Sequence, residues 1–184
     1  MHHISPEIIS CEKAYDIVAN SEPIALSEES EHRVAACRKF LDDKIANIDR
    51  PLYGITTGFG SLCDISISPE DLEKLQCNLM MSHACGMGDR VPRNIVRLML
   101  LLKAQSLSYG NSGVQVATVK RLIDFYNEGI TPVVYSQGSL GASGDLAPLA
   151  HLSLPLIGMG TVEYNGRIRP AAEVLDELGW VPVH

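Results

Sequence analysis

Apolar residues that recur three and four positions apart are the feature that most constrains how this chain of 184 residues can fold. Such spacing places the apolar side chains on one face of an α-helix, which can then be buried against a core. Short segments rich in glycine, proline and serine separate the periodic stretches, as is typical of loops between helices. The pattern therefore predicts a mainly α fold.

Four long helices are expected from capping signals and apolar faces. The predicted starts are Ser27, the segment Ser68-Pro69-Glu70-Asp71, Pro92 and Ser112. The apolar positions that follow them are, in order, Val34, Cys37, Leu41 and Ile45; Leu72, Leu75 and Leu79, with His83 on the same face; Ile95, Leu98, Met99 and Leu102; and Val119, Leu122, Ile123 and Tyr126. Gly129 is expected to end the fourth helix, because glycine readily adopts the left-handed conformation found after helices.

The last part of the chain is expected to contain a small β-hairpin. Residues 162–168 turn at Asn165-Gly166, and Asn-Gly is a strong signal for a two-residue hairpin loop. A short helix over 171–178 then ends at Gly179. No repeat or convincing linker interrupts the sequence, so residues 1–184 are interpreted as one domain.

Charge and composition exclude several classes of partner. The formal net charge is −7, and no block of five basic residues occurs. Nucleic acids and anionic membranes both require a concentrated positive field, so neither is expected as a partner. We expect no signal peptide, because residues 1–6 lack a basic region followed by an apolar core. We expect no membrane span, because no apolar run approaches the roughly 20 residues that cross a bilayer.

The cysteines indicate a reducing compartment. Their number is five, and no two of them form a Cys-x-x-Cys pair, so neither a disulfide framework nor a metal site is expected. Free thiols in the cytoplasm fit this pattern best, with Cys37 and Cys77 as small buried groups in helices.

The glycine-rich run from Gly138 to His151 carries the most specific signal. The tripeptide Ala142-Ser143-Gly144 by itself fits a simple turn or an anion site at a helix N-terminus. The whole run, however, closely resembles the signature of the histidine and aromatic amino-acid ammonia-lyases. The resemblance implies that the tripeptide cyclises without help into an electrophilic group, 4-methylideneimidazol-5-one (MIO), and that no metal is needed.

The residue types in the tripeptide suit that cyclisation. The amide nitrogen of Gly144 must reach the carbonyl carbon of Ala142, and small residues at both positions permit the compression. Ser143 must carry a hydroxyl that leaves as water. A helix that begins at Asp145 would direct its N-terminal amides toward the ring and stabilise negative charge there. Asp145 is interpreted as a helix cap or an aid to cyclisation, and His151 as structural.

A second glycine-rich segment, residues 53–60, resembles the Tyr-Gly-x-x-Thr-Gly-Phe-Gly signature of the same family. A tyrosine beside glycines is more often a surface or packing residue. The resemblance instead implies that Tyr53 is the acid/base group at the β-carbon of the substrate. Gly60, at the end of the segment, is expected to border the substrate.

Ser82 and His83 are the candidate residues for substrate recognition. A histidine near a helix terminus often only interacts with the helix dipole. In the family, however, the residue pair at this place contacts the substrate side chain, and Ser-His is similar to the histidine-specific members. Phenylalanine and tyrosine enzymes usually carry Phe-Leu or His-Leu there. Histidine can donate to or accept from an imidazole, which gives the match a physical basis.

The resemblance implies non-oxidative deamination of L-histidine to urocanate and ammonia, as in histidine catabolism. The nearest alternative keeps the cofactor and changes the enzyme to a tyrosine or phenylalanine ammonia-lyase or an aminomutase. A third reading is a catalytically incomplete fragment or interaction module.

Family members are longer, on the order of 500 residues, so this chain is expected to be the N-terminal, MIO-bearing helical domain of a fumarase/aspartase-like superfamily member. The missing part of such an enzyme supplies further site residues, including the arginine that binds the substrate carboxylate. Family members are homotetramers, and each active site combines residues from three subunits. The fragment alone is therefore expected to be inactive.

Overall fold

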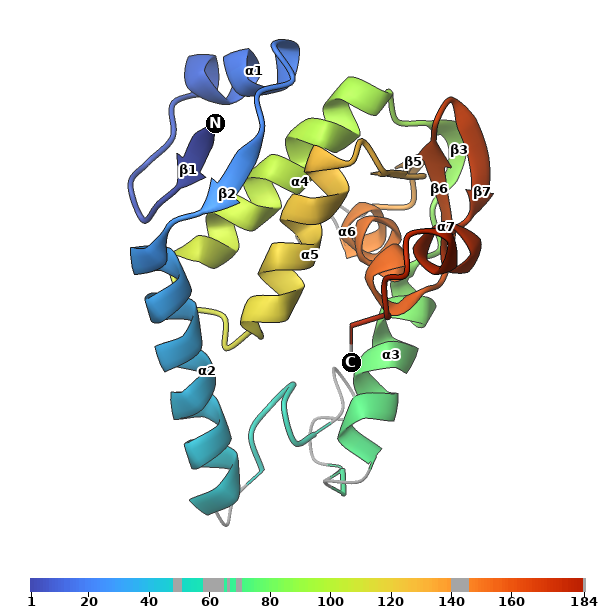
Figure 1. Ribbon diagram of the computed structural model, residues 1–184. Helices are drawn as coiled ribbons and strands as arrows, with labels where there is room; N and C mark the ends of the chain where they lie inside the picture. Colours follow the sequence, from blue (N-terminus) through green and yellow to red (C-terminus); the bar gives the residue numbers. More distant parts are fainter. Residues whose placement is uncertain (48–50, 58–64, 66, 69–70, 140–145, 184) are drawn as a thin grey trace.

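The computed structural model describes residues 1–47, 51–57, 65, 67–68, 71–139 and 146–183. The helices are α1 (Cys11–Ala19), α2 (Glu28–Asn47), α3 (Leu72–His83), α4 (Arg93–Ser108), α5 (Val116–Asn127), α6 (Leu146–Ser153) and α7 (Ala171–Glu177), with a 3-10 turn, η4, at Leu154–Ile157. The strands are β1 (His2–Ile4), β2 (Ile24–Leu26), β3 (Met87–Arg90), β4 (Thr131–Pro132), β5 (Tyr135–Gln137), β6 (Thr161–Tyr164) and β7 (Arg167–Pro170). Helices dominate and the strands form small sheets around them, which confirms the predicted fold class (Figure 1).

The core lies where α4 and α5 pack against each other (Figure 1). Helix α4 begins directly after Pro92, as predicted, because the fixed φ of proline suits the entry to a helix. The fully buried residues of the two helices include Leu100, Leu101, Ala104, Val119, Phe125 and Tyr126. The buried face of α4 differs in part from the predicted one. Ile95 and Leu102, both predicted to lie on that face, remain 43% and 42% exposed in this chain.

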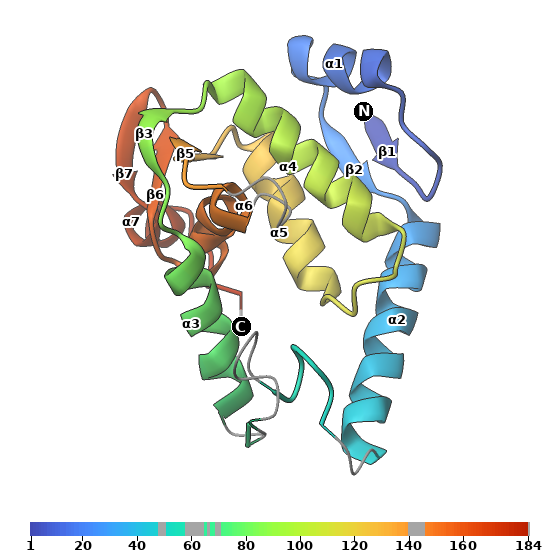
Figure 2. The ribbon, with the colours of Figure 1, turned by 180° about the vertical axis from the view of Figure 1, so that it is seen from behind.

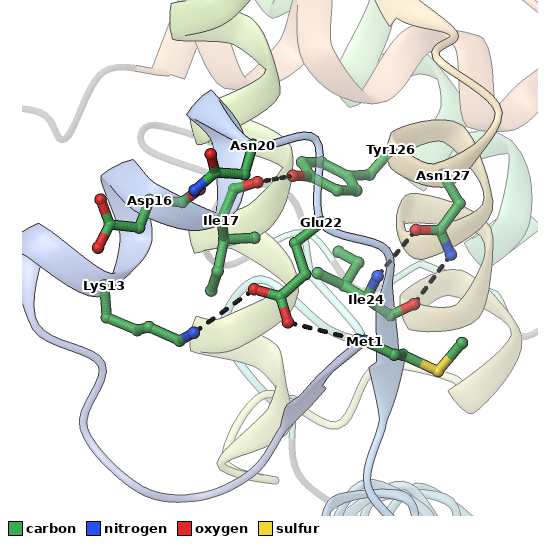
Figure 3. Close-up of polar contacts among 9 residues, drawn as sticks. All are labelled: Met1, Lys13, Asp16, Ile17, Asn20, Glu22, Ile24, Tyr126 and Asn127. Atoms are coloured by element: carbon green, nitrogen blue, oxygen red, sulfur yellow. Dashed lines mark hydrogen bonds and ion pairs between the residues drawn. The ribbon is translucent and has the colours of Figure 1, made fainter.

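The N-terminal segment is fixed to this core by hydrogen bonds to α5 (Figure 3). Strands β1 and β2 pair in parallel, with His2 opposite Ile24. The Asn127 side chain accepts a hydrogen bond from the Ile24 amide at 2.9 Å and donates to the Ile24 carbonyl at 2.8 Å. The hydroxyl of the buried Tyr126 donates to the carbonyl of Ile17 in α1 at 3.1 Å. These contacts join segments about a hundred residues apart, and the sequence pattern did not predict them.

Helix α2 confirms one predicted cap. The Ser27 hydroxyl accepts a hydrogen bond from the amide of Ser30 at 3.2 Å, and the helix runs from Glu28.

The cap predicted for helix α5 was wrong. Helix α5 begins at Val116 after Gln115, and Ser112 does not cap it. The cause lies at Gly113, whose φ of +65° is left-handed and whose amide donates to Cys37 Sγ at 3.2 Å. A Cβ at Gly113 would come within 2.6 Å of Leu41, so packing against α2 holds this backbone out of a helical conformation.

Helix α3 lies apart from the main core. Asp71 is its N-cap, and the amide of Asp71 donates to the Ser68 carbonyl at 3.0 Å, while Pro69 and Glu70 of the predicted start lie outside the described residues. No residue of α3 is buried in this chain, and Cys77 of α3 and Cys37 of α2, both predicted to be buried, are only half-buried. One side of α3 packs against α6.

The C-terminal part confirms the predicted hairpin. Strands β6 and β7 pair in antiparallel register and β4 adds to the edge of β6, forming a sheet on the side of the core away from α1 and β1 (Figure 2). Asn165 and Gly166 have φ values of 51° and 71°, as a type I′ turn requires. Helix α7 ends at Glu177, one residue earlier than expected, and Gly179 follows with a φ of +69°.

Candidate functional site

Tyr53 lies on a tight turn that two threonines hold in place. The amide of Leu52 donates to Thr56 Oγ1 at 2.8 Å, and the amide of Gly54 donates to Thr57 Oγ1 at 3.2 Å. Thr57 is 1% exposed, whereas Tyr53 is 63% exposed in this chain. Gly54 has a φ of +71°, a conformation that glycine adopts without strain. The sequence around Tyr53 thus builds a turn that directs the tyrosine outward.

Ser82 and His83 occupy the C-terminal end of α3. Nδ1 of His83 lies 2.8 Å from the carbonyl oxygen of Leu79 and 3.1 Å from Ser82 Oγ. A carbonyl oxygen only accepts, so Nδ1 carries the ring proton and donates to it. The Ser82 hydroxyl donates to the same carbonyl at 2.9 Å. In the neutral ring this arrangement leaves the lone pair on Nε2, which can accept a hydrogen bond from a ligand.

The turn that carries Tyr53 and the pair Ser82-His83 belong to different parts of the chain. Figure 1 shows residues 51–57 between the end of α2 and α3. Ser82 and His83 lie at the far end of α3 from its start at Leu72, about 18 Å along the axis of a twelve-residue helix.

The tripeptide Ala142-Ser143-Gly144, predicted to form the electrophile, lies outside the described residues, as do Asp145 and Gly60. What the structure describes is the helix that follows. Helix α6 begins at Leu146, two residues after Gly144, so the amides of Leu146 and Ala147 point out of its N-terminal end. Pro148, in the same turn, has no amide hydrogen to contribute. The small residues of the tripeptide and the start of α6 fit the formation of an electrophile at this point.

His151 of α6 faces the segment that follows His83. Its Nε2 accepts a hydrogen bond from the Gly86 amide at 3.0 Å, and its ring meets that of Tyr135 edge to face at 5.1 Å between centroids. Burial lowers the pKa of His151 below its ordinary value, which favours the neutral ring that this acceptor role requires. His151, interpreted from the sequence as structural, thus makes a hydrogen bond and a ring contact whose partners the sequence did not identify.

Two further properties concern the described ranges only. Their His, Cys, Asp and Glu side chains form no group of three that could hold a metal ion. None of the helices in those ranges combines the length and the apolar character needed to cross a bilayer.

Comparison with known proteins identifies the family. The profile of the family described as aromatic amino acid lyase matches residues 9–184. This chain belongs to the aromatic amino acid lyase family. Histidine ammonia-lyase from Deinococcus radiodurans is 50% identical over 175 residues, which is 95% of this chain and 33% of the relative.

Solved structures of family members share the fold. Phenylalanine aminomutase from Pantoea agglomerans has a TM-score of 0.92 and 32% identity, covering 100% of this chain and 35% of its own. Histidine ammonia-lyase from Trypanosoma cruzi has a TM-score of 0.88 and 33% identity, covering 100% of this chain and 35% of its own. The chain thus spans about a third of the length of the relatives it matches.

Proposed function

We propose that the protein to which this chain belongs is a histidine ammonia-lyase, which converts L-histidine to urocanate and ammonia. The observation that carries the proposal is the pair Ser82-His83, held at the end of α3 with Nε2 of His83 as the acceptor. Curated relatives named histidine ammonia-lyase, 50% and 46% identical over 95% and 99% of this chain, support the same substrate.

The cofactor in this proposal is MIO, formed from Ala142, Ser143 and Gly144. It supplies an electrophile that turns the α-amino group of the substrate into a workable leaving group. The amides at the start of α6 stabilise negative charge that develops near Ser143.

We assign to Tyr53 the removal of the proton from the β-carbon of the substrate. Its phenolate oxygen accepts this proton, and the electron pair of the broken C–H bond forms the double bond of urocanate while ammonia leaves from the α-carbon. The turn held by Thr56 and Thr57 supports the role, because it fixes the backbone on both sides of Tyr53.

His83 and Ser82 are assigned to the substrate imidazole. Nε2 of His83 accepts a hydrogen bond from the imidazole N–H, and the contact with Leu79 keeps the His83 ring in that orientation. Gly60 is assigned a place beside the substrate, where the lack of a side chain leaves room. A phenylalanine substrate would leave Nε2 of His83 without a partner, which disfavours that alternative.

We further propose that the complete protein is a cytoplasmic homotetramer. The lack of buried residues in α3 and the 63% exposure of Tyr53 in this chain support an assembly in which other chain segments complete the site. The residues missing here would include the arginine that binds the carboxylate of the substrate.

The test is a substrate panel on the full-length protein. L-Histidine, L-tyrosine and L-phenylalanine are supplied separately, and the product is identified by absorbance and mass. The proposal predicts urocanate and ammonia from L-histidine, and loss of both in the Ser143→Ala variant. Deamination of tyrosine or phenylalanine alone would move the assignment to that alternative, and a β-amino acid product would make the protein an aminomutase.

A further inference from the structure

Gly86 is contacted closely by two other parts of the chain. It lies three residues after His83, and its amide donates to Nε2 of His151 at 3.0 Å. A Cβ at Gly86 would stand 3.0 Å from the His151 ring and 3.2 Å from Cβ of Tyr135. The ring of His151 therefore rests directly on the backbone of Gly86, with no space for a side chain between them.

Gly138 approaches Gly86 in the same way. Its φ is +122°, and a Cβ there would lie 2.9 Å from Cα of Gly86 and 3.4 Å from the carbonyl oxygen of Cys85. The pairing of Met87 with Gln137, between β3 and β5, continues this contact. The backbone at Gly138 is therefore held against the residue that His151 also contacts.

Gly138 and His151 are the first and last residues of the signature run that contains Ala142-Ser143-Gly144. Both ends of the run converge on Gly86, which lies three residues after the helix end that carries Ser82 and His83. The edge-to-face contact of His151 with Tyr135 adds β5 to the same cluster. One hydrogen bond thus joins the substrate-binding end of α3 to the helix after the tripeptide.

We propose that His151 is a positioning residue, whose acceptor atom Nε2 fixes Gly86 and thereby sets the distance between His83 and helix α6. The inference rests on the proposed function, since it assigns His83 to the substrate and the segment before α6 to the electrophile. A small displacement between two such groups lowers the rate strongly, because the reacting atoms must meet in a defined geometry.

The acceptor position allows a matched pair of variants. A glutamine at 151 can place its carbonyl oxygen near the position of Nε2, whereas an asparagine reaches only the position of Nδ1. Both side chains are polar amides, so they differ chiefly in whether they reach the Gly86 amide. His32, which is exposed on α2, provides the control substitution His32→Asn.

The experiment compares wild type, His151→Gln, His151→Asn and His32→Asn as full-length proteins. Rates are expressed per cyclised site, counted by intact mass, so that a defect in cyclisation does not pass for a defect in positioning. We expect His151→Asn to lower kcat/KM for L-histidine by about 10- to 100-fold. We expect His151→Gln to stay within about 3-fold of wild type, because a retained hydrogen bond keeps most of the geometry.

The outcomes separate this inference from the proposed function. A wild type that cyclises and releases no urocanate contradicts the proposed function. An active wild type with equal kcat/KM for the asparagine and glutamine variants overturns the positioning role. A crystal structure of His151→Gln is the second readout, and it should place the glutamine oxygen within hydrogen-bond distance of the Gly86 amide. A glutamine side chain turned away from Gly86 in an active variant also overturns the role.

Discussion

At the scale of single residues, Tyr53 and His83 are oriented by short local contacts. The hydroxyls of Thr56 and Thr57 bond to backbone amides on either side of Tyr53. The Leu79 carbonyl, one helical turn before His83, fixes the ring through Nδ1. The backbone beside Tyr53 and the ring of His83 are therefore held by residues within four positions in the sequence.

The Tyr53→Phe variant tests the proton-transfer role. Phenylalanine keeps the ring and removes the hydroxyl, so kcat for urocanate formation should fall by about 10²- to 10⁴-fold, as for loss of a general base. The mass decrease of the tripeptide should be retained, because Tyr53 has no part in cyclisation. Tyr15→Phe, at an exposed tyrosine of α1, is the control and should match wild type. A Tyr53→Phe variant with the kcat of wild type would contradict the proton-transfer role.

Substrate recognition is tested by the double variant Ser82→His, His83→Leu. Leucine cannot accept a hydrogen bond, and losing one to the substrate imidazole costs about 1–3 kcal/mol. We therefore expect kcat/KM for L-histidine to fall by about 10- to 100-fold, with most of the change in KM. An unchanged KM for L-histidine would show that the pair does not contact the imidazole.

At the scale of elements, local signals predicted where helices begin and long-range packing decided the exceptions. Ser27 caps α2 as expected because its hydroxyl needs only the amide three residues ahead. Ser112 has the same chemistry but fails as a cap, because Gly113 is held against Cys37 and Leu41 of α2. A capping pattern contains no information about such a contact, since it joins residues 76 positions apart.

The candidate site likewise combines contacts between sequence neighbours with contacts between distant residues. Tyr53, Ser82 and His83 could be chosen as candidates because they stand in recognisable motifs. Their contacts Thr56, Thr57 and Leu79 are sequence neighbours. The contact of His151 with Gly86 joins residues 65 positions apart and follows only from the packing of α3, β5 and α6.

The attachment of β2 to α5 gives an element-scale prediction of stability. Ile24 is 1% exposed and both of its backbone groups bond to Asn127. Asn127→Ala leaves these groups unpaired, so the free energy of unfolding should fall by about 1–3 kcal/mol in urea denaturation. The control Asn47→Ala removes a contact within α2 and should change it by less than about 0.5 kcal/mol. Equal effects of the two substitutions would refute the anchoring role.

At the scale of the whole molecule, the chain corresponds to only part of its relatives. It spans about a third of its relatives, and α3 buries no residue within it. We expect residues 1–184 alone to release no urocanate, since the arginine proposed to bind the substrate carboxylate would lie outside them. The full-length protein, assayed beside it at equal molar concentration, should be active and tetrameric by light scattering. An active 1–184 fragment would contradict the account of a shared site.

The central claim is that Ala142, Ser143 and Gly144 form the electrophile, and the intact mass of the full-length protein tests it most directly. Ring closure and dehydration each release one water molecule. The wild-type mass should therefore be two waters below the value calculated from the sequence, and fragmentation should place the loss within residues 142–144. The Ser143→Ala variant should not lose the water that comes from the serine hydroxyl. A wild-type mass equal to the calculated value, in protein that has had time to mature, would contradict the claim.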